Sequence, residues 1–97
     1  MINHGLSPKN LAIIHNVLGD YKEVYIFGSR VKGTYKPFSD LDVCIKKPLA
    51  DHEVELLAEK FTESDLPFKV DLILYDEVDE NFKKRIDQEA VPLAKFQ

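Results

Sequence analysis

The connection between two apolar runs near the middle of the chain limits the sheet that this sequence can form. Residues 23–27 and 41–45 are rich in β-branched and aromatic side chains, as strands are. Between them, residues 28–39 contain glycine, serine, threonine and proline, with room for one helical turn around residues 30–32. Parallel strands need a longer crossover, so we expect a mixed sheet and not a purely parallel one.

Helical patterns lie on both sides of these runs. Ser7 followed by Pro8 predicts the start of a helix that ends near Gly19. Residues 50–62 place their apolar side chains on one stripe, with Leu56 as the exception, which predicts an amphipathic helix. A third strand is expected within residues 68–75, the most apolar run of the chain.

The last expected element is a helix that begins after Asp79 as its cap and packs through Phe82 and Ile86. The order helix, strand, strand, helix, strand, helix predicts the α+β class, as an α/β sandwich in which helices cover a small mixed sheet of at least three strands. Because 97 residues with 44% hydrophobic side chains can bury one core, we expect residues 1–97 to form a single domain.

Charge is unevenly distributed along the chain. The net charge is −4, which argues against broad, sequence-independent binding to nucleic acid. Residues 21–50 nevertheless hold six lysines and arginines against three acidic residues. A local cationic excess of this size suits a small anion better than a long polyanion.

The cysteine content and the N-terminus point to one cellular compartment. Cys44 is the single cysteine, so no internal disulfide can form. The first residues lack the basic and apolar regions of a signal peptide, and no apolar run is long enough to span a bilayer. We therefore expect a cytoplasmic protein with no membrane partner.

Two carboxylates separated by one residue are the strongest chemical signal. Asp40 and Asp42 are expected on the same face of a strand, where their charges repel unless a cation lies between them. Asp71 interrupts an apolar strand, where an unpaired charge is costly, and a neighbouring strand can bring it to the same place. Carboxylate oxygens are ligands that suit Mg²⁺ or Mn²⁺, so these three residues predict a divalent metal site for phosphoryl or nucleotidyl transfer.

A glycine and serine turn precedes these carboxylates. Gly28 allows the backbone to approach a phosphate closely, and Ser29 can donate a hydrogen bond to it. Lys32 can neutralise phosphate charge. Arg30 can be either a phosphate ligand or a structural ion-pair partner. On a purely structural interpretation, Gly28 and Ser29 form only a turn, and Ser39 with Asp40 only a cap, but this leaves Asp42 within a strand unexplained.

Gly28-Ser29, the ten residues that follow and Asp40-Leu41-Asp42 together resemble the DNA polymerase beta-like nucleotidyltransferase superfamily. Gly28-Ser29-Arg30-Val31-Lys32-Gly33 and Ser39-Asp40-Leu41-Asp42 are most similar to its minimal nucleotidyltransferase (MNT) branch. The resemblance implies the polymerase beta-like palm fold and a site for two Mg²⁺ ions, for which Mn²⁺ can substitute. Asp40 and Asp42 would hold both ions, and Asp71 would complete the site. It also implies a nucleotide site at Gly28, Ser29, Arg30, Lys32 and Ser39.

The resemblance further implies a partner protein. Minimal nucleotidyltransferases are commonly encoded beside a HEPN-domain ribonuclease toxin and act as its antitoxin, in known cases by transferring AMP from ATP to a toxin tyrosine. The leading hypothesis is therefore a Mg²⁺-dependent nucleotidyltransferase that uses ATP or another nucleoside triphosphate (NTP) and modifies a hydroxyl of a partner macromolecule.

Two other hypotheses remain at this point. In the first, the chain neutralises a HEPN toxin by binding alone, with a vestigial nucleotide site, through an exposed apolar patch at Val91, Pro92, Leu93 and Phe96. In the second, it is a terminal transferase for RNA, which the acidic charge and the lack of an RNA-binding appendage disfavour.

Overall fold

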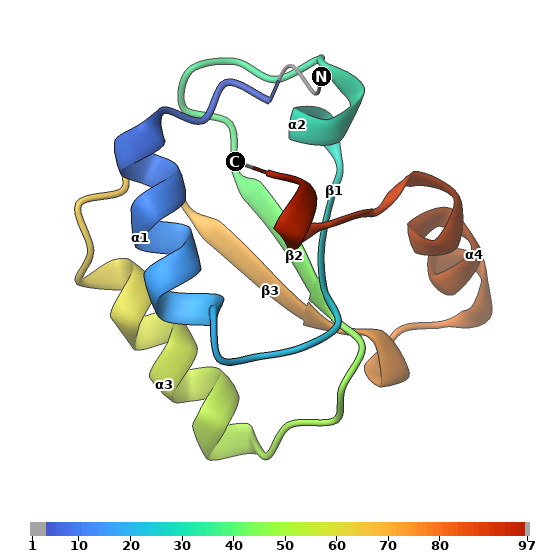
Figure 1. The fold of residues 1–97 in the computed structure, drawn as a ribbon. Coiled ribbons are helices and arrows are strands. Elements are labelled where there is room, and N and C mark those ends of the chain that lie inside the picture. Colours follow the sequence, from blue (N-terminus) through green and yellow to red (C-terminus); the bar gives the residue numbers. More distant parts are fainter. Residues whose placement is uncertain (1–3, 97) are drawn as a thin grey trace.

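The described residues, 4–96 of the computed structural model, form a four-stranded sheet with helices on both faces (Figure 1). The strands lie in the order β3-β2-β1-β4. This arrangement confirms the predicted α+β class with a small mixed sheet. In chain order the elements are α1 (Pro8–Leu18), β1 (Val24–Phe27), α2 (Ser29–Lys32), β2 (Leu41–Ile45), α3 (Asp51–Thr62), β3 (Val70–Leu74), the 3₁₀ turn η1 (Tyr75–Glu77), α4 (Glu80–Glu89), β4 (Val91–Pro92) and the 3₁₀ turn η2 (Leu93–Lys95).

The predicted caps start two of the helices. The Ser7 hydroxyl oxygen accepts a hydrogen bond from the Asn10 backbone N–H at 3.1 Å, at the start of α1. The Asp79 carboxylate accepts one from the Phe82 N–H at 2.8 Å, at the start of α4. In α3, Leu56 is 50% exposed, as its position off the apolar stripe predicts. Within residues 4–96, no helix is both long and apolar enough to cross a membrane.

The sheet is mixed, as the short connection after β1 predicts. β1 pairs with β2 in the antiparallel sense, and β2 pairs with β3 in the parallel sense. β4 was not expected as a strand, and it contains Pro92, which cannot donate a backbone hydrogen bond. It pairs antiparallel with β1 at the edge of the sheet, where a missing N–H is tolerated.

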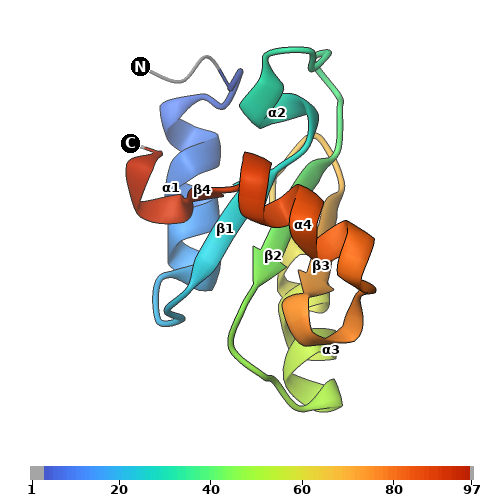
Figure 2. The ribbon, with the colours of Figure 1, turned by 90° about the vertical axis from the view of Figure 1, so that its right-hand side faces the viewer.

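Each face of the sheet buries its own apolar cluster. The larger cluster packs α1 and α3 against the sheet and includes Ile14, Leu18 and Leu57. The smaller cluster consists of Phe27, Cys44 and Ile86, with further side chains of α4 around it. Figure 2, viewed from the α4 side, shows α4 in front of the strands. The two clusters therefore differ in size, and the smaller one lies on the face that α4 covers.

The C-terminal segment contradicts one expectation. Leu93 and Phe96 are 7% and 1% exposed and belong to the larger cluster. A ring nitrogen of His15 lies 2.8 Å from the carbonyl oxygen of Phe96, which ties this segment to α1. The prediction of an exposed apolar patch around Val91, Pro92, Leu93 and Phe96 is wrong, because β4 and η2 turn the two largest side chains inward.

Candidate active site

Asp42 and Asp71 lie opposite each other on neighbouring strands. The parallel register of β2 and β3 pairs Asp42 directly with Asp71, and the antiparallel register of β1 and β2 pairs Asp42 with Phe27. Asp40 comes immediately before β2 and is exposed. Cys44, two residues after Asp42, packs against Ile86 of α4, so Asp42 and Asp71 point to the α4 face. The fold thus pairs two of the three carboxylates that the sequence singled out, and the third, Asp40, lies two residues before Asp42.

The Asp42 carboxyl group is in an unfavourable environment for a negative charge. Burial raises the pKa of Asp42 above its ordinary value, and the charges of Asp71 and Asp40 raise it further. Arg85 of α4 has the opposite effect and lowers this pKa, but it does not cancel the others. This end of the sheet therefore has excess negative charge that a bound cation would relieve.

The turn after β1 lies against the same carboxylate. Gly28 has a φ of 80°, a conformation that favours glycine, and a Cβ added to it would collide with the Asp42 carboxylate. The Gly28 carbonyl accepts hydrogen bonds from the N–H groups of Val31 and Lys32, both at 3.1 Å, which fixes the start of α2. The Gly28-Ser29 turn is thereby held next to Asp42, with Ser29 half-buried.

Arg30 does not point into this site. It is 1% exposed, and its guanidinium group donates to the carbonyl oxygens of His4 at 3.0 Å and Ser39 at 2.9 Å. Of the two roles predicted for Arg30, the observed contacts favour the structural one and not that of a phosphate ligand. The partners of Arg30 are backbone carbonyls, however, and not the acidic side chain of an ion pair. In this position the guanidinium group is not available to a phosphate.

Lys32 is held by an ion pair that the sequence did not predict. Its ammonium group lies 3.0 Å from the carboxylate of Glu89, and Arg85 lies 3.3 Å from the same oxygen. The second oxygen of Glu89 is buried and has no hydrogen-bond partner among the described residues. Arg85 and Glu89 were missed because nothing in the sequence of α4 indicates which of its charged residues face Asp42.

Ser39 uses its polar groups to shape the loop before Asp40. Its hydroxyl oxygen accepts a hydrogen bond from the Lys36 N–H at 2.7 Å, and its own N–H donates to the Lys36 carbonyl at 3.0 Å. These bonds close a turn around Pro37 and Phe38. Ser39 therefore fixes the loop in this structure, and a hydrogen bond from it to a nucleotide remains a prediction.

The donor set suits a divalent cation. Three carboxylates supply hard oxygen ligands, and the repulsion at Asp42 is the electrostatic condition that a cation relieves. As the side chains lie, however, no group of three His, Cys, Asp or Glu residues within residues 4–96 is close enough to hold a metal ion. Side-chain rotation would be needed to close the ligand set, and exposed Asp40 and Asp71 are free to rotate about their side-chain torsions.

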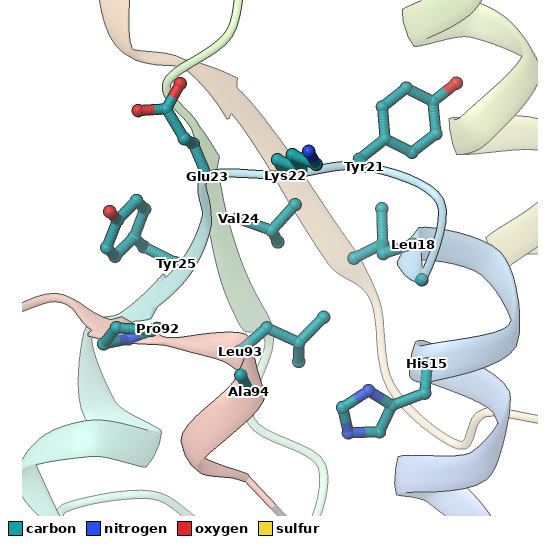
Figure 3. A pocket seen from close by; sticks show the side chains of 11 residues that line it. His15, Leu18, Tyr21, Lys22, Glu23, Val24, Tyr25, Pro92, Leu93 and Ala94 are labelled. Carbon is teal, nitrogen blue, oxygen red and sulfur yellow. The ribbon is translucent and has the colours of Figure 1, made fainter.

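Two cavities lie at different distances from these carboxylates. A pocket of about 360 Å³ opens between α3 and β3 and reaches Asp71. A pocket of about 550 Å³ lies at the opposite end of β1, where Val24, Leu18 and Leu93 line it (Figure 3). Because Gly28 follows the other end of β1, this larger pocket is separate from the carboxylate site.

Comparison with known proteins agrees with this geometry. Residues 14–94 match the nucleotidyltransferase domain family, a range that includes every candidate site residue. The chain belongs to this family. It is therefore an enzyme of the nucleotidyltransferase class.

Individual relatives agree with the narrower resemblance to MNT antitoxins. The chain is 41% identical over 87 residues to the "Probable protein adenylyltransferase MntA" of Haemophilus influenzae, covering 84% of this chain and 75% of that protein. It is similar to a crystal structure of a toxin–antitoxin with AMP-PNP, with a TM-score of 0.69 and 26% identity over 87% of this chain and 72% of that one. A mutant MntA-HpeT toxin–antitoxin structure, at 22% identity and a TM-score of 0.61, shares the fold over 87% of this chain and 71% of that one.

Proposed function

We propose that this nucleotidyltransferase is a protein adenylyltransferase that transfers AMP from ATP to a tyrosine hydroxyl of a HEPN-domain toxin and so acts as its antitoxin. Two similarities support this proposal: the 41% identity to a protein named as an adenylyltransferase and the fold shared with a toxin–antitoxin structure that contains AMP-PNP. In the chain itself, the supporting observation is the pairing of Asp42 with Asp71 beside the Gly28 turn.

The proposed divalent cations, two Mg²⁺ ions that Mn²⁺ can replace, would be held by Asp40, Asp42 and Asp71. When bound, such cations neutralise phosphate charge and favour the ionised form of an attacking hydroxyl. Gly28 leaves room for the backbone to approach the triphosphate, and Ser29 donates a hydrogen bond to it. Lys32 supplies positive charge next to the same turn once its ion pair with Glu89 opens. Ser39 is proposed as a further nucleotide contact.

In the proposed reaction, the acceptor hydroxyl loses its proton to solvent, and its oxygen forms a bond to the α-phosphorus of ATP. The bond from that phosphorus to the oxygen that bridges to the β-phosphate breaks, and pyrophosphate leaves. We place this chemistry within a single domain, residues 1–97, in the cytoplasm. The acceptor hydroxyl then comes from a separate protein.

Intact-mass spectrometry tests this function. The chain is incubated with ATP, Mg²⁺ and its proposed partner, a HEPN-domain toxin, and the partner is expected to gain the mass of AMP. Asp40→Asn and Asp42→Asn remove the charge with little change in size, so both variants are expected to stop the transfer. Asp65→Asn, at an exposed loop position away from the site, is the matched control and is expected to transfer normally.

One result would favour neutralisation by binding alone. If the chain suppresses the partner's ribonuclease activity without ATP or divalent cation, and neither protein gains mass, the proposed transfer is wrong. Transfer at the wild-type rate by both asparagine variants would contradict the roles of these carboxylates.

A further inference from the structure

Arg30 is the one charged residue among the buried side chains of residues 4–96. A buried guanidinium group loses its hydration, so its position needs strong compensating contacts. It has two kinds of contact here, hydrogen bonds to backbone carbonyls and the faces of aromatic rings. Its Nε lacks a hydrogen-bond partner within the described residues, so the compensation is incomplete and comes from the terminal nitrogens and the rings.

The hydrogen bonds join the loop before Asp40 to α2. One terminal nitrogen donates to the Ser39 carbonyl at 2.9 Å and, more weakly, to the Pro37 carbonyl at 3.4 Å. The other donates to the His4 carbonyl at 3.0 Å, so the N-terminal segment is included as well. Ser39 immediately precedes Asp40. The guanidinium group therefore fixes the backbone that leads directly into the first carboxylate.

The aromatic contacts extend this connection to β3. The guanidinium carbon lies 4.3 Å from the centre of the Phe68 ring and 5.4 Å from that of Tyr35. Phe68 comes just before β3, and the neighbouring Lys69 carbonyl accepts a hydrogen bond from the Leu41 N–H at 2.9 Å. This segment leads directly into Asp71. A single side chain thus contacts the segments that precede Asp40 and Asp71, and it belongs to α2, next to Ser29.

We infer that Arg30 is a positioning residue that sets the spacing between the Gly28-Ser29 turn, Asp40 and Asp71 without contacting the nucleotide. This inference rests on the proposed function in one respect. The proposed function gives the purpose of the spacing, which is divalent cation binding and nucleotidyl transfer. Lysine cannot replace arginine here, because one ammonium group lacks the planar fork that reaches several carbonyls and stacks on a ring.

The test is the affinity of the metal-free protein for Mn²⁺ alone, measured by electron paramagnetic resonance in wild type and Arg30→Lys. Because changes to residues that orient metal ligands commonly weaken binding by about 10- to 100-fold, we expect at least about a tenfold loss in the variant. In transfer assays we expect kcat to fall by a similar factor while KM for ATP changes by less than about threefold, since no nucleotide contact is lost.

Controls separate positioning from general loss of stability. Ile14→Val removes one methyl group from the core cluster under α1 and is expected to lower stability while leaving Mn²⁺ affinity close to wild type. If Arg30→Lys does not fold, Phe68→Leu removes the ring beneath the guanidinium group and keeps an apolar side chain. It is expected to weaken Mn²⁺ binding in the same direction, by a smaller factor.

Two results would overturn the inference. One is wild-type Mn²⁺ affinity in Arg30→Lys, or in Phe68→Leu where that variant is used. The other is an increase in KM for ATP with unchanged Mn²⁺ affinity, which would make Arg30 a phosphate ligand. If wild type transfers no AMP but Arg30→Lys still weakens Mn²⁺ binding, the proposed function fails while the positioning role stands.

Discussion

Replacing Asp42 with asparagine is expected to make the metal-free protein more stable while it stops nucleotidyl transfer. The Asp42 carboxylate faces Asp71 across β2 and β3, and burial with the charges of Asp71 and Asp40 raises its pKa. A raised pKa means that the folded chain binds this proton more tightly than the unfolded chain does. The ionised carboxylate therefore lowers the stability of the fold at neutral pH, and this loss is relieved as the pH falls through the folded-state pKa.

The size of the effect follows from the strand spacing. Neighbouring strands lie about 4.8 Å apart, and two unit charges at that distance repel by about 1 kcal/mol at the dielectric constant of water and about 3 kcal/mol at an effective constant of 20. Because Asp71 is exposed, the lower value applies. In a domain of this size, about 1 kcal/mol corresponds to an increase in Tm of about 4–8 °C.

The assay is thermal unfolding followed by circular dichroism, with a chelator present, at low salt and neutral pH. Asp42→Asn is expected to melt above wild type, and the difference should shrink in high salt and as the pH falls through the raised pKa of Asp42, where the wild-type carboxyl becomes protonated. Asp65→Asn is the control and should melt within a degree or two of wild type, because surface substitutions usually change stability by less than about 0.5 kcal/mol. A Tm of Asp42→Asn equal to or below that of wild type would refute the electrostatic reasoning.

Three further predictions concern neighbouring residues. Burial raises the pKa of Cys44 to about 11, so the thiol stays protonated at pH 8. Iodoacetamide should therefore label Cys44 only after unfolding. Rapid labelling of the native protein would contradict the burial of this side chain. In urea unfolding, Gly28→Ala should lower the free energy of unfolding by more than Gly33→Ala does. Both glycines have a positive φ, a backbone conformation that costs alanine about 1–2 kcal/mol. Only at Gly28 would the added methyl group also collide with Asp42. Glu89→Gln frees Lys32 and Arg85 from a competing carboxylate. It should lower KM for ATP by about two- to fivefold, which corresponds to the free energy of an exposed ion pair. An unchanged or higher KM would mean that these cations do not contact the nucleotide.

Local patterns predicted most of the elements, because their causes lie within a few residues. Ser7 and Asp79 cap helices through bonds to residues three positions later, so a short sequence window contains both partners. The short connection after β1 was enough to exclude a purely parallel sheet, and β1 and β2 do pair in the antiparallel sense. The position of Leu56 off the apolar stripe likewise predicted its exposure.

The errors involve contacts between distant parts of the chain. β4 pairs with β1 across most of the sequence, and this pairing buries Leu93 and Phe96, which local composition alone suggested to be exposed. Arg30 stacks on Phe68 and bonds the Ser39 carbonyl, and neither partner is apparent from the residues next to it. The same limit concealed Glu89 as the partner of Lys32.

The candidate carboxylates were predictable for a different reason. Asp42 is costly in the strand where it occurs, and a charge that weakens the fold is a sign of function. Asp71 was noticed because it interrupts an apolar strand, but the structure leaves its side chain exposed. What the sequence could not give was their register, since only the parallel pairing of β2 and β3 places the two side chains opposite each other.

The most direct test of the central claim, AMP transfer from ATP to a partner protein, follows the phosphorus atoms of ATP. The chain, Mg²⁺ and the proposed toxin partner are incubated with ATP labelled at either the α- or the γ-phosphorus. We predict that the partner protein becomes labelled only from the α-position, with release of pyrophosphate, and that Asp42→Asn abolishes this labelling. Label transferred from the γ-position, or no label from either position, would contradict the account.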